Sequence, residues 1–249
     1  MRSFKNKFLI KIKSFHRFVL DILFPISCLK CQEYGKWLCD QCLREIKTCT
    51  EQICPICEKV FTPDGKTCLT CRKKTSLDGL LVCASYQEKI IPKIIHAFKY
   101  KFILNLQYPL GEIMTRAILS SNLPLADFII PIPLHSKRMR WRGFNQSLLL
   151  AEYIGKNITP GIKVPILSDA LYRNKNTSSQ MKIKNYQKRK ENIFNAFSVI
   201  NKKAVERKNI FLIDDIATTG ATLFECASIL KKAGAKKVFA IVIARQEIR

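Results

Sequence analysis

Two adjacent carboxylates, Asp214 and Asp215, precede a short run of small and hydroxyl residues that could bind a phosphate. Residues 217–222 read Ala-Thr-Thr-Gly-Ala-Thr. A loop of this composition can direct several backbone N–H groups at one anion, and a helix that begins there adds its positive end. The carboxylates could hold sugar hydroxyls or metal-bound water. The pattern therefore predicts a ligand with both a phosphate and a diol, such as a sugar phosphate.

A buried strand and a helix must position these groups. Residues 210–213 read Ile-Phe-Leu-Ile, an apolar run typical of a central parallel strand that is covered on both faces. The carboxylates then lie at the carboxyl end of the strand, where open α/β sheets bind ligands. A helix over residues 221–233 should follow and end at Gly234. The simpler alternative is a strand–loop–helix turn in which an Asp only caps the helix.

Eight of the eleven cysteines form four C-x-x-C pairs, a pattern typical of metal ligation in a reducing compartment. These pairs predict two structural Zn²⁺ sites, because four thiolates fill the tetrahedral coordination of each ion. Sequential sites are the simplest pairing, and a cross-braced arrangement also remains open. The metal would supply the folding energy of this segment. The ligands are Cys28, Cys31, Cys39, Cys42, Cys54, Cys57, Cys68 and Cys71.

The length of 249 residues allows one sizeable domain and a small one. We expect an N-terminal amphipathic helix over residues 1–24, a double zinc ribbon over 25–72 and an α/β domain over 79–249. In the last of these, we expect strands over 80–86, 127–134 and 237–244, and helices over 90–100, 107–121 and 145–158. Together they predict a mostly parallel sheet flanked by helices.

The formal net charge of +24 predicts a polyanionic partner such as nucleic acid, although a lysine-rich composition throughout the chain could also produce it. The sequence shows no apolar stretch of transmembrane length. In residues 1–24, basic residues are scattered among the apolar ones, which argues against a signal peptide. This segment favours helix packing or docking, with weak contact to a membrane surface as the alternative.

The segment Asp214–Thr222 resembles the phosphoribosyl pyrophosphate (PRPP) loop of type I phosphoribosyltransferases. The resemblance implies that Asp214 and Asp215 hold the ribose hydroxyls and Mg²⁺-bound water. It also implies that the loop wraps the 5-phosphate. The basic residues that follow strand 127–134 could clamp the pyrophosphate, or they could form a solvated basic loop. The loop residues are Ala217, Thr218, Thr219, Gly220, Ala221 and Thr222, and the clamp candidates are Lys137, Arg138 and Arg140.

Besides the cysteine pairs and the PRPP loop, the sequence contains two further motifs, Pro131-Ile132-Pro133 and Arg142-Gly143-Phe144-Asn145-Gln146. With them the chain is similar to the ComF/GntX family over roughly residues 20–245. The resemblance implies a type I phosphoribosyltransferase fold after a double zinc ribbon. It also implies a cytoplasmic role in natural transformation, in which the protein handles incoming single-stranded DNA. A competence helicase or other transformation proteins would then be partners.

Residues 173–208 match the family's flexible segment through the pattern Arg173, Thr177, Gln180, Arg189, Asn192 and Phe197. This segment could close over the pyrophosphate or follow a phosphate backbone. Tyr172, just before this segment, and Tyr186 and Phe194 within it could stack on single-stranded bases or anchor the segment in the core. No acceptor pocket is recognisable in the sequence. An active phosphoribosyltransferase with an unknown acceptor and a zinc-module adaptor for a helicase-like partner therefore remain alternatives.

Overall fold

The structure is a computed structural model that describes residues 25–175 and 193–246. It divides into two compact units, Met1–Glu45 and Ile46–Arg249. The described part of the first unit consists of turns and the helix α2 (Asp40–Glu45). The helix expected over residues 1–24 lies outside the described residues, as do Thr177, Gln180, Tyr186, Arg189 and Asn192 of the expected flexible segment. The three domain boundaries remain a prediction.

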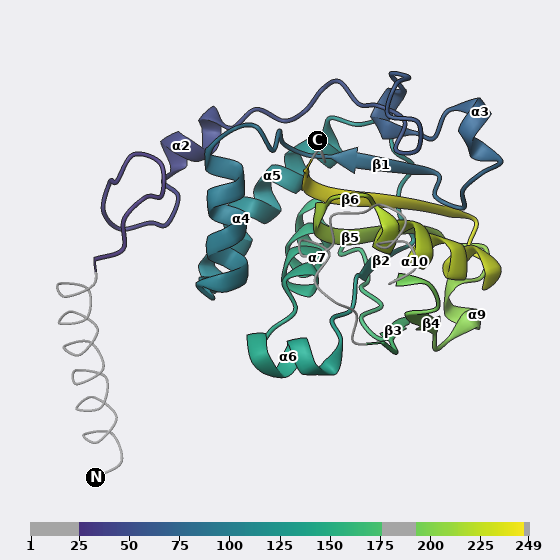
Figure 1. Cartoon of the computed structure of the whole chain (residues 1–249). Helices are drawn as coiled ribbons and strands as arrows, with labels where there is room; N and C mark the ends of the chain where they lie inside the picture. Colours follow the sequence, from purple (N-terminus) through teal and green to yellow (C-terminus); the bar gives the residue numbers. More distant parts are fainter. Residues whose placement is uncertain (1–24, 176–192, 247–249) are drawn as a thin grey trace, which may run out of the picture. The chain divides into compact units, whose positions relative to one another are not determined.

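The second unit is built on a four-stranded parallel sheet with the order β1-β6-β5-β2 (Figure 1). Its strands are β1 (Gly79–Val82), β2 (Phe128–Pro131), β5 (Asn209–Ala217) and β6 (Lys237–Arg245). The two long central strands, β5 and β6, are buried along most of their length, because both faces of the sheet are covered. An isolated parallel bridge between Ile129 and Ile166 extends the pairing beyond β2.

Helices cover both faces of this sheet (Figure 1). The helices α5 (Gln107–Leu119) and α7 (Gln146–Asn157) pack against each other and on one face. The helix α10 (Ala221–Lys232) covers the other face beside the hairpin of β3 (Leu171–Arg173) and β4 (Phe197–Val199). The other helices are α3 (Leu69–Arg72), α4 (Ile90–Tyr100), α6 (Ser136–Arg142) and α9 (Lys202–Val205), with 3-10 turns at Pro63–Gly65 and Leu104–Leu106. The expected fold class is confirmed.

No helix among the described residues has the length and apolar character needed to cross a membrane.

Local capping explains where the helices near the site begin. The Asn145 side chain accepts a hydrogen bond from the Ser147 N–H, so Asn145 is the predicted N-cap of α7. The basic segment before it is a short helix, α6, and not only a loop. The His135 side chain caps α6 by accepting from the Lys137 N–H, and Gly143 ends it at φ 79°. These two caps account for a helix that apolar periodicity does not predict.

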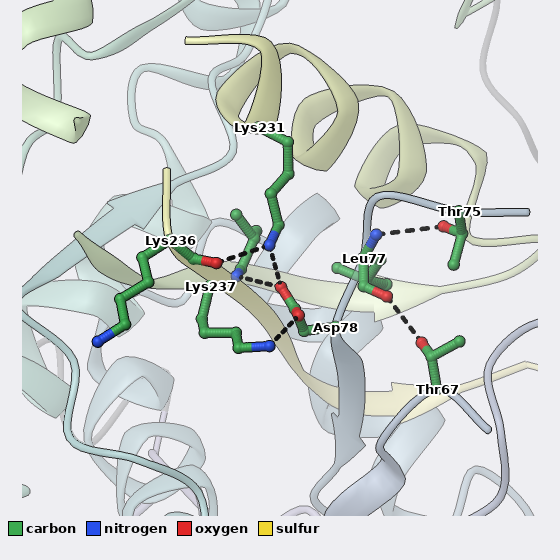
Figure 2. Close-up of polar contacts among 8 residues, drawn as sticks. Thr67, Thr75, Leu77, Asp78, Lys231, Lys236 and Lys237 are labelled. Carbon is green, nitrogen blue, oxygen red and sulfur yellow. Dashed lines mark hydrogen bonds and ion pairs between the residues drawn. The ribbon is translucent and has the colours of Figure 1, made fainter. Parts of the chain in front are cut away.

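The carboxylate of Asp78, just before β1, fastens three elements at the amino ends of the strands (Figure 2). Its oxygens pair with Lys231 Nζ at 2.7 Å and Lys237 Nζ at 3.0 Å. The Val238 N–H also donates to Asp78 Oδ2 at 2.8 Å. Burial acts to raise the pKa of Asp78, but the hydrogen bonds from Lys231, Val238 and Lys237 hold it below its ordinary value. The network thus joins the start of β1 to the end of α10 and the start of β6.

Replacing this carboxylate should destabilise the second unit. We expect Asp78→Asn to lower the free energy of unfolding by about 2 kcal/mol at pH 7, because two charge-assisted bonds are lost from a largely buried group. Since the folded-state pKa is lowered, the stabilisation is present above the ordinary Asp pKa of about 3.9 and is lost as the pH falls further. Urea unfolding at pH 7 and pH 3 measures both effects. The exposed Asp169→Asn is the matched control, and equal stability of the two variants at pH 7 would contradict the prediction.

Candidate functional site

A pocket of about 170 Å³ opens in the second unit at the carboxyl ends of β2, β5 and β6. Parallel α/β sheets bind their ligands at this edge. Helices α4, α6, α7 and α10 and strand β3 also contribute lining residues. The charged and hydrogen-bonding side chains of the lining are Tyr86, His96, Lys99, Tyr100, Arg138, Arg142, Gln146, Ser147, Arg173, Asp214, Asp215, Thr218, Thr222 and Gln246. The pocket therefore gathers the predicted acid pair with several cations.

The two acids lie inside strand β5, not beyond its end. The sequence places the end of the apolar run at Ile213, but pairing with β6 continues as far as Ala217. Successive strand residues point to opposite faces, so the two carboxylates reach different partners. Asp215 Oδ1 forms an ion pair with Lys99 Nζ at 2.8 Å, whereas Asp214 Oδ1 accepts from the Ser147 hydroxyl at 3.0 Å.

One oxygen of this acid pair has no hydrogen-bond partner in the part of the chain that the structure describes. Asp215 is only 2% exposed, and its Oδ2 is buried without a hydrogen bond among the described residues. A buried carboxylate oxygen in this state costs free energy unless a ligand satisfies it. Ribose hydroxyls and Mg²⁺-bound water both offer the donors that this oxygen lacks. The residues present therefore fit a sugar ligand with Mg²⁺.

The other acid is held partly protonated near neutral pH. Burial, followed by the neighbouring Asp215 carboxylate, raises the pKa of Asp214 to about 7. Lys99 and the hydrogen bonds from the Asp215 N–H and the Ser147 hydroxyl act in the opposite direction but do not cancel the burial. Two carboxylates at adjacent positions in one buried site cannot both ionise without further positive charge.

The loop after β5 provides part of the predicted phosphate cradle. Thr218, Gly220 and Thr222 line the pocket, as does Ala217, whereas Thr219 and Ala221 do not. The Thr219 side chain is buried, and its hydroxyl instead accepts from the Ala221 N–H at 3.4 Å. Gly220, Thr222 and Leu223 line the pocket, so the amino end of α10 lies at the pocket wall. No side chain caps this end in the described chain, so its backbone N–H groups keep their positive field.

Gly220 is needed where the loop turns into α10. Its φ is 74°, and a Cβ at this position would lie 2.9 Å from the Phe224 ring. Any side chain would therefore strain the backbone and crowd the ring. The glycine keeps the loop tight at the entrance to the helix.

Three arginines line the pocket together: Arg138, Arg142 and Arg173. Burial, followed by the charge of Arg138, lowers the pKa of Arg173 to about 10. Burial, followed by Arg142, also lowers the pKa of Arg138. The positive charge of Arg142 thus disfavours the charged form of Arg138, and that of Arg138 disfavours the charged form of Arg173. Guanidinium groups crowded in this way are typical of a site that receives an anion with several oxygens.

The clamp candidates do not all reach the pocket. Arg138 lines it, whereas Lys137 and Arg140 are exposed on α6 and are not among the lining residues. Arg142 belongs to the Arg-Gly-Phe-Asn-Gln motif, and Arg173 begins the expected flexible segment. The structure thus adds these two arginines to the basic group that the sequence suggests.

Lys99 is the functional candidate that the sequence analysis missed. It lies in α4, far from the two acids in the sequence, and no neighbouring residue indicates that it forms an ion pair with an acid of β5. Its spacing does carry a signal, since Ile91, Ile95 and Lys99 recur at i, i+4 on one helix face and both isoleucines are buried. A cation on a buried stripe needs a buried partner, which here is Asp215.

Both cysteine clusters are assembled as sequential sites. In Cys28, Cys31, Cys39 and Cys42, and likewise in Cys54, Cys57, Cys68 and Cys71, the four sulfur atoms lie within 4.8 Å of one another. The cross-braced alternative is therefore excluded. The first cluster lies in the unit Met1–Glu45, and the second lies in the unit that contains the sheet. Each set of four thiols could hold a zinc ion.

Comparisons with known proteins agree with this architecture. The model of the phosphoribosyl transferase domain matches residues 148–249. The chain is 30% identical to the DNA utilization protein YhgH of Shigella flexneri over 223 residues, which cover 86% of this chain and 94% of that protein. It is 28% identical to competence protein F of Haemophilus influenzae over 232 residues, or 89% and 98% of the two chains. It is also 28% identical to competence protein ComFC of Bacillus subtilis over 228 residues, or 84% of each.

Among solved structures, the glutamine PRPP amidotransferase from B. subtilis matches with a TM-score of 0.36 and 19% identity. The match covers 56% of this chain and 27% of that chain, and a likeness this distant supports no argument.

The burial of Asp214 should make the protein less stable as the pH rises. Its pKa is higher in the folded than in the unfolded state, so the folded protein binds the extra proton between about pH 4 and pH 7, and ionisation above that range opposes folding. We therefore expect Asp214→Asn to stabilise the protein, by about 2 kcal/mol more at pH 8 than at pH 5. Urea unfolding at the two pH values measures this difference. A gain that does not change with pH, or that Asp169→Asn reproduces, would refute the assignment.

Proposed function

This chain belongs to the ComF family, and from that membership we propose that its pocket binds PRPP together with Mg²⁺. We further propose that the protein acts in the cytoplasm, where it handles single-stranded DNA during natural transformation. The observation that carries the ligand proposal is the buried Asp215 oxygen, which has no partner among the residues described and belongs to the same pocket as three arginines and a phosphate-type loop.

The pocket offers a separate partner for each part of PRPP. The loop residues Thr218, Gly220 and Thr222, with the start of α10, would hold the 5-phosphate. The carboxylates of Asp214 and Asp215 would accept hydrogen bonds from the ribose hydroxyls and from water bound to Mg²⁺. The arginines would hold the pyrophosphate, because guanidinium groups bind its oxygens in pairs.

Among the described residues, Lys99 forms an ion pair with one of the two carboxylates, so a metal ion would add positive charge beside the acid pair. When bound, Mg²⁺ would supply positive charge that offsets part of the charge of the pyrophosphate, and the carboxylates of Asp214 and Asp215 would hold it through its bound water. The role of this chain is to hold the acid pair in place. Lys99 fixes Asp215, and Ser147 fixes Asp214. Filling the site with a divalent cation would also lower the pKa of Asp214, since positive charge favours the carboxylate.

Transfer of the phosphoribosyl group to an acceptor is a second candidate function. The observation that favours it is a group of ring side chains, Tyr86, His96 and Tyr100, which line the same pocket and could hold a flat acceptor. In that reaction the arginines would stabilise the charge that develops on the departing pyrophosphate.

The DNA proposal rests on family membership and charge. The relatives carry the names competence protein and DNA utilization protein. The formal net charge of +24 suits a polyphosphate backbone. Clusters of free thiols that bind metal persist in a reducing compartment, which supports the cytoplasm as the location.

PRPP binding can be tested by calorimetry in the presence of Mg²⁺. We expect the wild-type protein to bind PRPP and the double variant Asp214→Ala with Asp215→Ala to lose about 10- to 100-fold in affinity, because two charge-assisted contacts to the ligand disappear. The Asp169→Ala variant, at an exposed site, should bind as the wild type does. Absence of binding to the wild type, or equal binding to the double variant, would overturn the proposal.

We also propose that each cysteine cluster holds one structural Zn²⁺. Metal analysis of protein purified without chelator should find two zinc ions per chain, and the Cys71→Ser variant should retain only one. That variant should also lower the melting temperature of the sheet unit, since its cluster belongs to that unit. Cys49→Ser, outside both clusters, is the control that should keep two ions. Wild-type protein that folds without any zinc would contradict the proposal.

A further inference from the structure

Large aromatic side chains gather beside the pocket, on α6 and at the end of α4. We call Tyr100, Phe102, Trp141 and Phe144 the aromatic patch. Trp141 is 60% exposed, Phe102 43% and Tyr100 37%. Apolar rings left in water at neighbouring positions mark a binding surface more often than a structural need.

The rings hold one another in place. The centroid of Trp141 lies 5.5 Å from that of Phe102 and 6.4 Å from that of Tyr100. Phe102 also contacts Phe144, whose ring packs at 5.7 Å on the fully buried Phe98. The patch is therefore anchored in the core while its outer rings face water. Rings fixed in this way lose little conformational entropy when a ligand stacks on them.

The charged residues of the two segments that form the patch are all basic. The two segments that form it, residues 98–109 and 135–147, contain no Asp or Glu. They carry the cations Lys99, Lys101, Lys137, Arg138, Arg140 and Arg142. Lys101, Lys137 and Arg140 are exposed, so they are available to an anionic ligand that runs past the rings. The surface thus combines flat apolar faces with positive charge. A protein partner with a purely apolar face would form no ion pairs with these cations.

Arg142 joins the patch to the pocket. Its guanidinium lies 5.6 Å from the centre of the Tyr100 ring and 5.8 Å from that of Trp141. Its Nη1 donates to Gln146 Oε1 at 2.6 Å, and both residues line the pocket. The Nε of Arg142 is buried without a partner among the described residues. One arginine therefore serves both surfaces.

We propose that the aromatic patch is the place where unpaired bases of single-stranded DNA stack, beside the mouth of the PRPP pocket. The proposal rests on the proposed function for the identity of the strand as DNA. A single strand offers both things that this surface can bind, exposed base faces and a phosphate backbone. A duplex hides its base faces, so it can use only the cations. The outward side chains Lys137 and Arg140, which the sequence suggested for pyrophosphate, are assigned to the DNA backbone instead.

Tryptophan fluorescence reports on this surface directly. The chain contains two tryptophans, so in a Trp37→Phe variant Trp141 is the only one. Titration with a single-stranded thymidylate oligonucleotide at fixed salt should quench its fluorescence, and the same oligonucleotide paired in a duplex should not. Binding of the single strand without any change in Trp141 fluorescence overturns the proposal. A uridylate oligonucleotide run in parallel distinguishes the source of the strand, and tighter binding of this RNA overturns the assignment to DNA.

Substitutions then separate stacking from charge. Trp141→Ala and Phe102→Ala should each weaken single-strand binding about tenfold, because each removes a stacking face. Trp141→Phe should restore most of the affinity, since it restores a ring. Phe61→Ala, at a site 69% exposed on the second cysteine module, is the matched control and should change nothing. Equal losses for Phe61→Ala and Trp141→Ala, or no loss for Trp141→Ala, overturn the proposal.

The experiments distinguish a failure of the DNA-stacking proposal from a failure of the PRPP proposal. Calorimetry with PRPP and Mg²⁺ tests the pocket in the absence of DNA, and the oligonucleotide titration tests the patch in the absence of PRPP. Unchanged urea unfolding of Trp141→Ala shows that a loss of DNA binding comes from the surface and not from the fold.

Discussion

The ion pair between Lys99 and Asp215 is the interaction on which the site depends. Asp215 is almost fully buried at the ligand edge of the sheet, and a charge in that position must be neutralised. Lys99 does so from α4, which fixes that helix as a wall of the pocket. Asp214 instead accepts from the Ser147 hydroxyl, and burial, followed by the Asp215 carboxylate, raises the pKa of Asp214 to about 7. The protein thus buries two adjacent carboxylates beside one lysine, and Mg²⁺ bound with an anionic ligand would add positive charge next to them.

The rest of the second unit keeps this arrangement rigid. Pairing of β5 with β6 runs past both acids, so the sheet itself sets the direction of each carboxylate. At the opposite edge, the Asp78 network ties β1, β6 and the end of α10 together with ordinary, fully paired charges (Figure 2). The two edges differ, because Asp78 is fully hydrogen-bonded at one of them, whereas at the other the Asp215 Oδ2 has no partner among the described residues. We expect the first edge to contribute stability, and we propose that the second edge binds the ligand.

Sequence reasoning succeeded where the deciding interactions are local. Three features depend only on residues that are close together in the sequence: the strand and loop around Asp214, the Asn145 cap and the C-x-x-C pairs. The structure contains each of them. It missed Lys99, since the pairing with Asp215 joins residues far apart in the chain through packing of α4 on the sheet edge. The basic run after β2 was recognised, but its folding into the helix α6 was not predicted, and so neither was the direction of each basic side chain. The phase of this helix decides that Arg138 turns toward the pocket while Lys137 and Arg140 stay exposed.

We propose that one pocket binds the two ends of PRPP by different means, with a backbone loop at one end and arginines at the other. Phosphorus NMR tests this most directly, because the 5-phosphate and the pyrophosphate give separate signals. Titrating the protein into PRPP with Mg²⁺ should shift or broaden the signals of both ends, and Arg173→Gln should reduce the effect on the pyrophosphate while the 5-phosphate still responds. Signals that stay unchanged at both ends in excess protein would contradict the account.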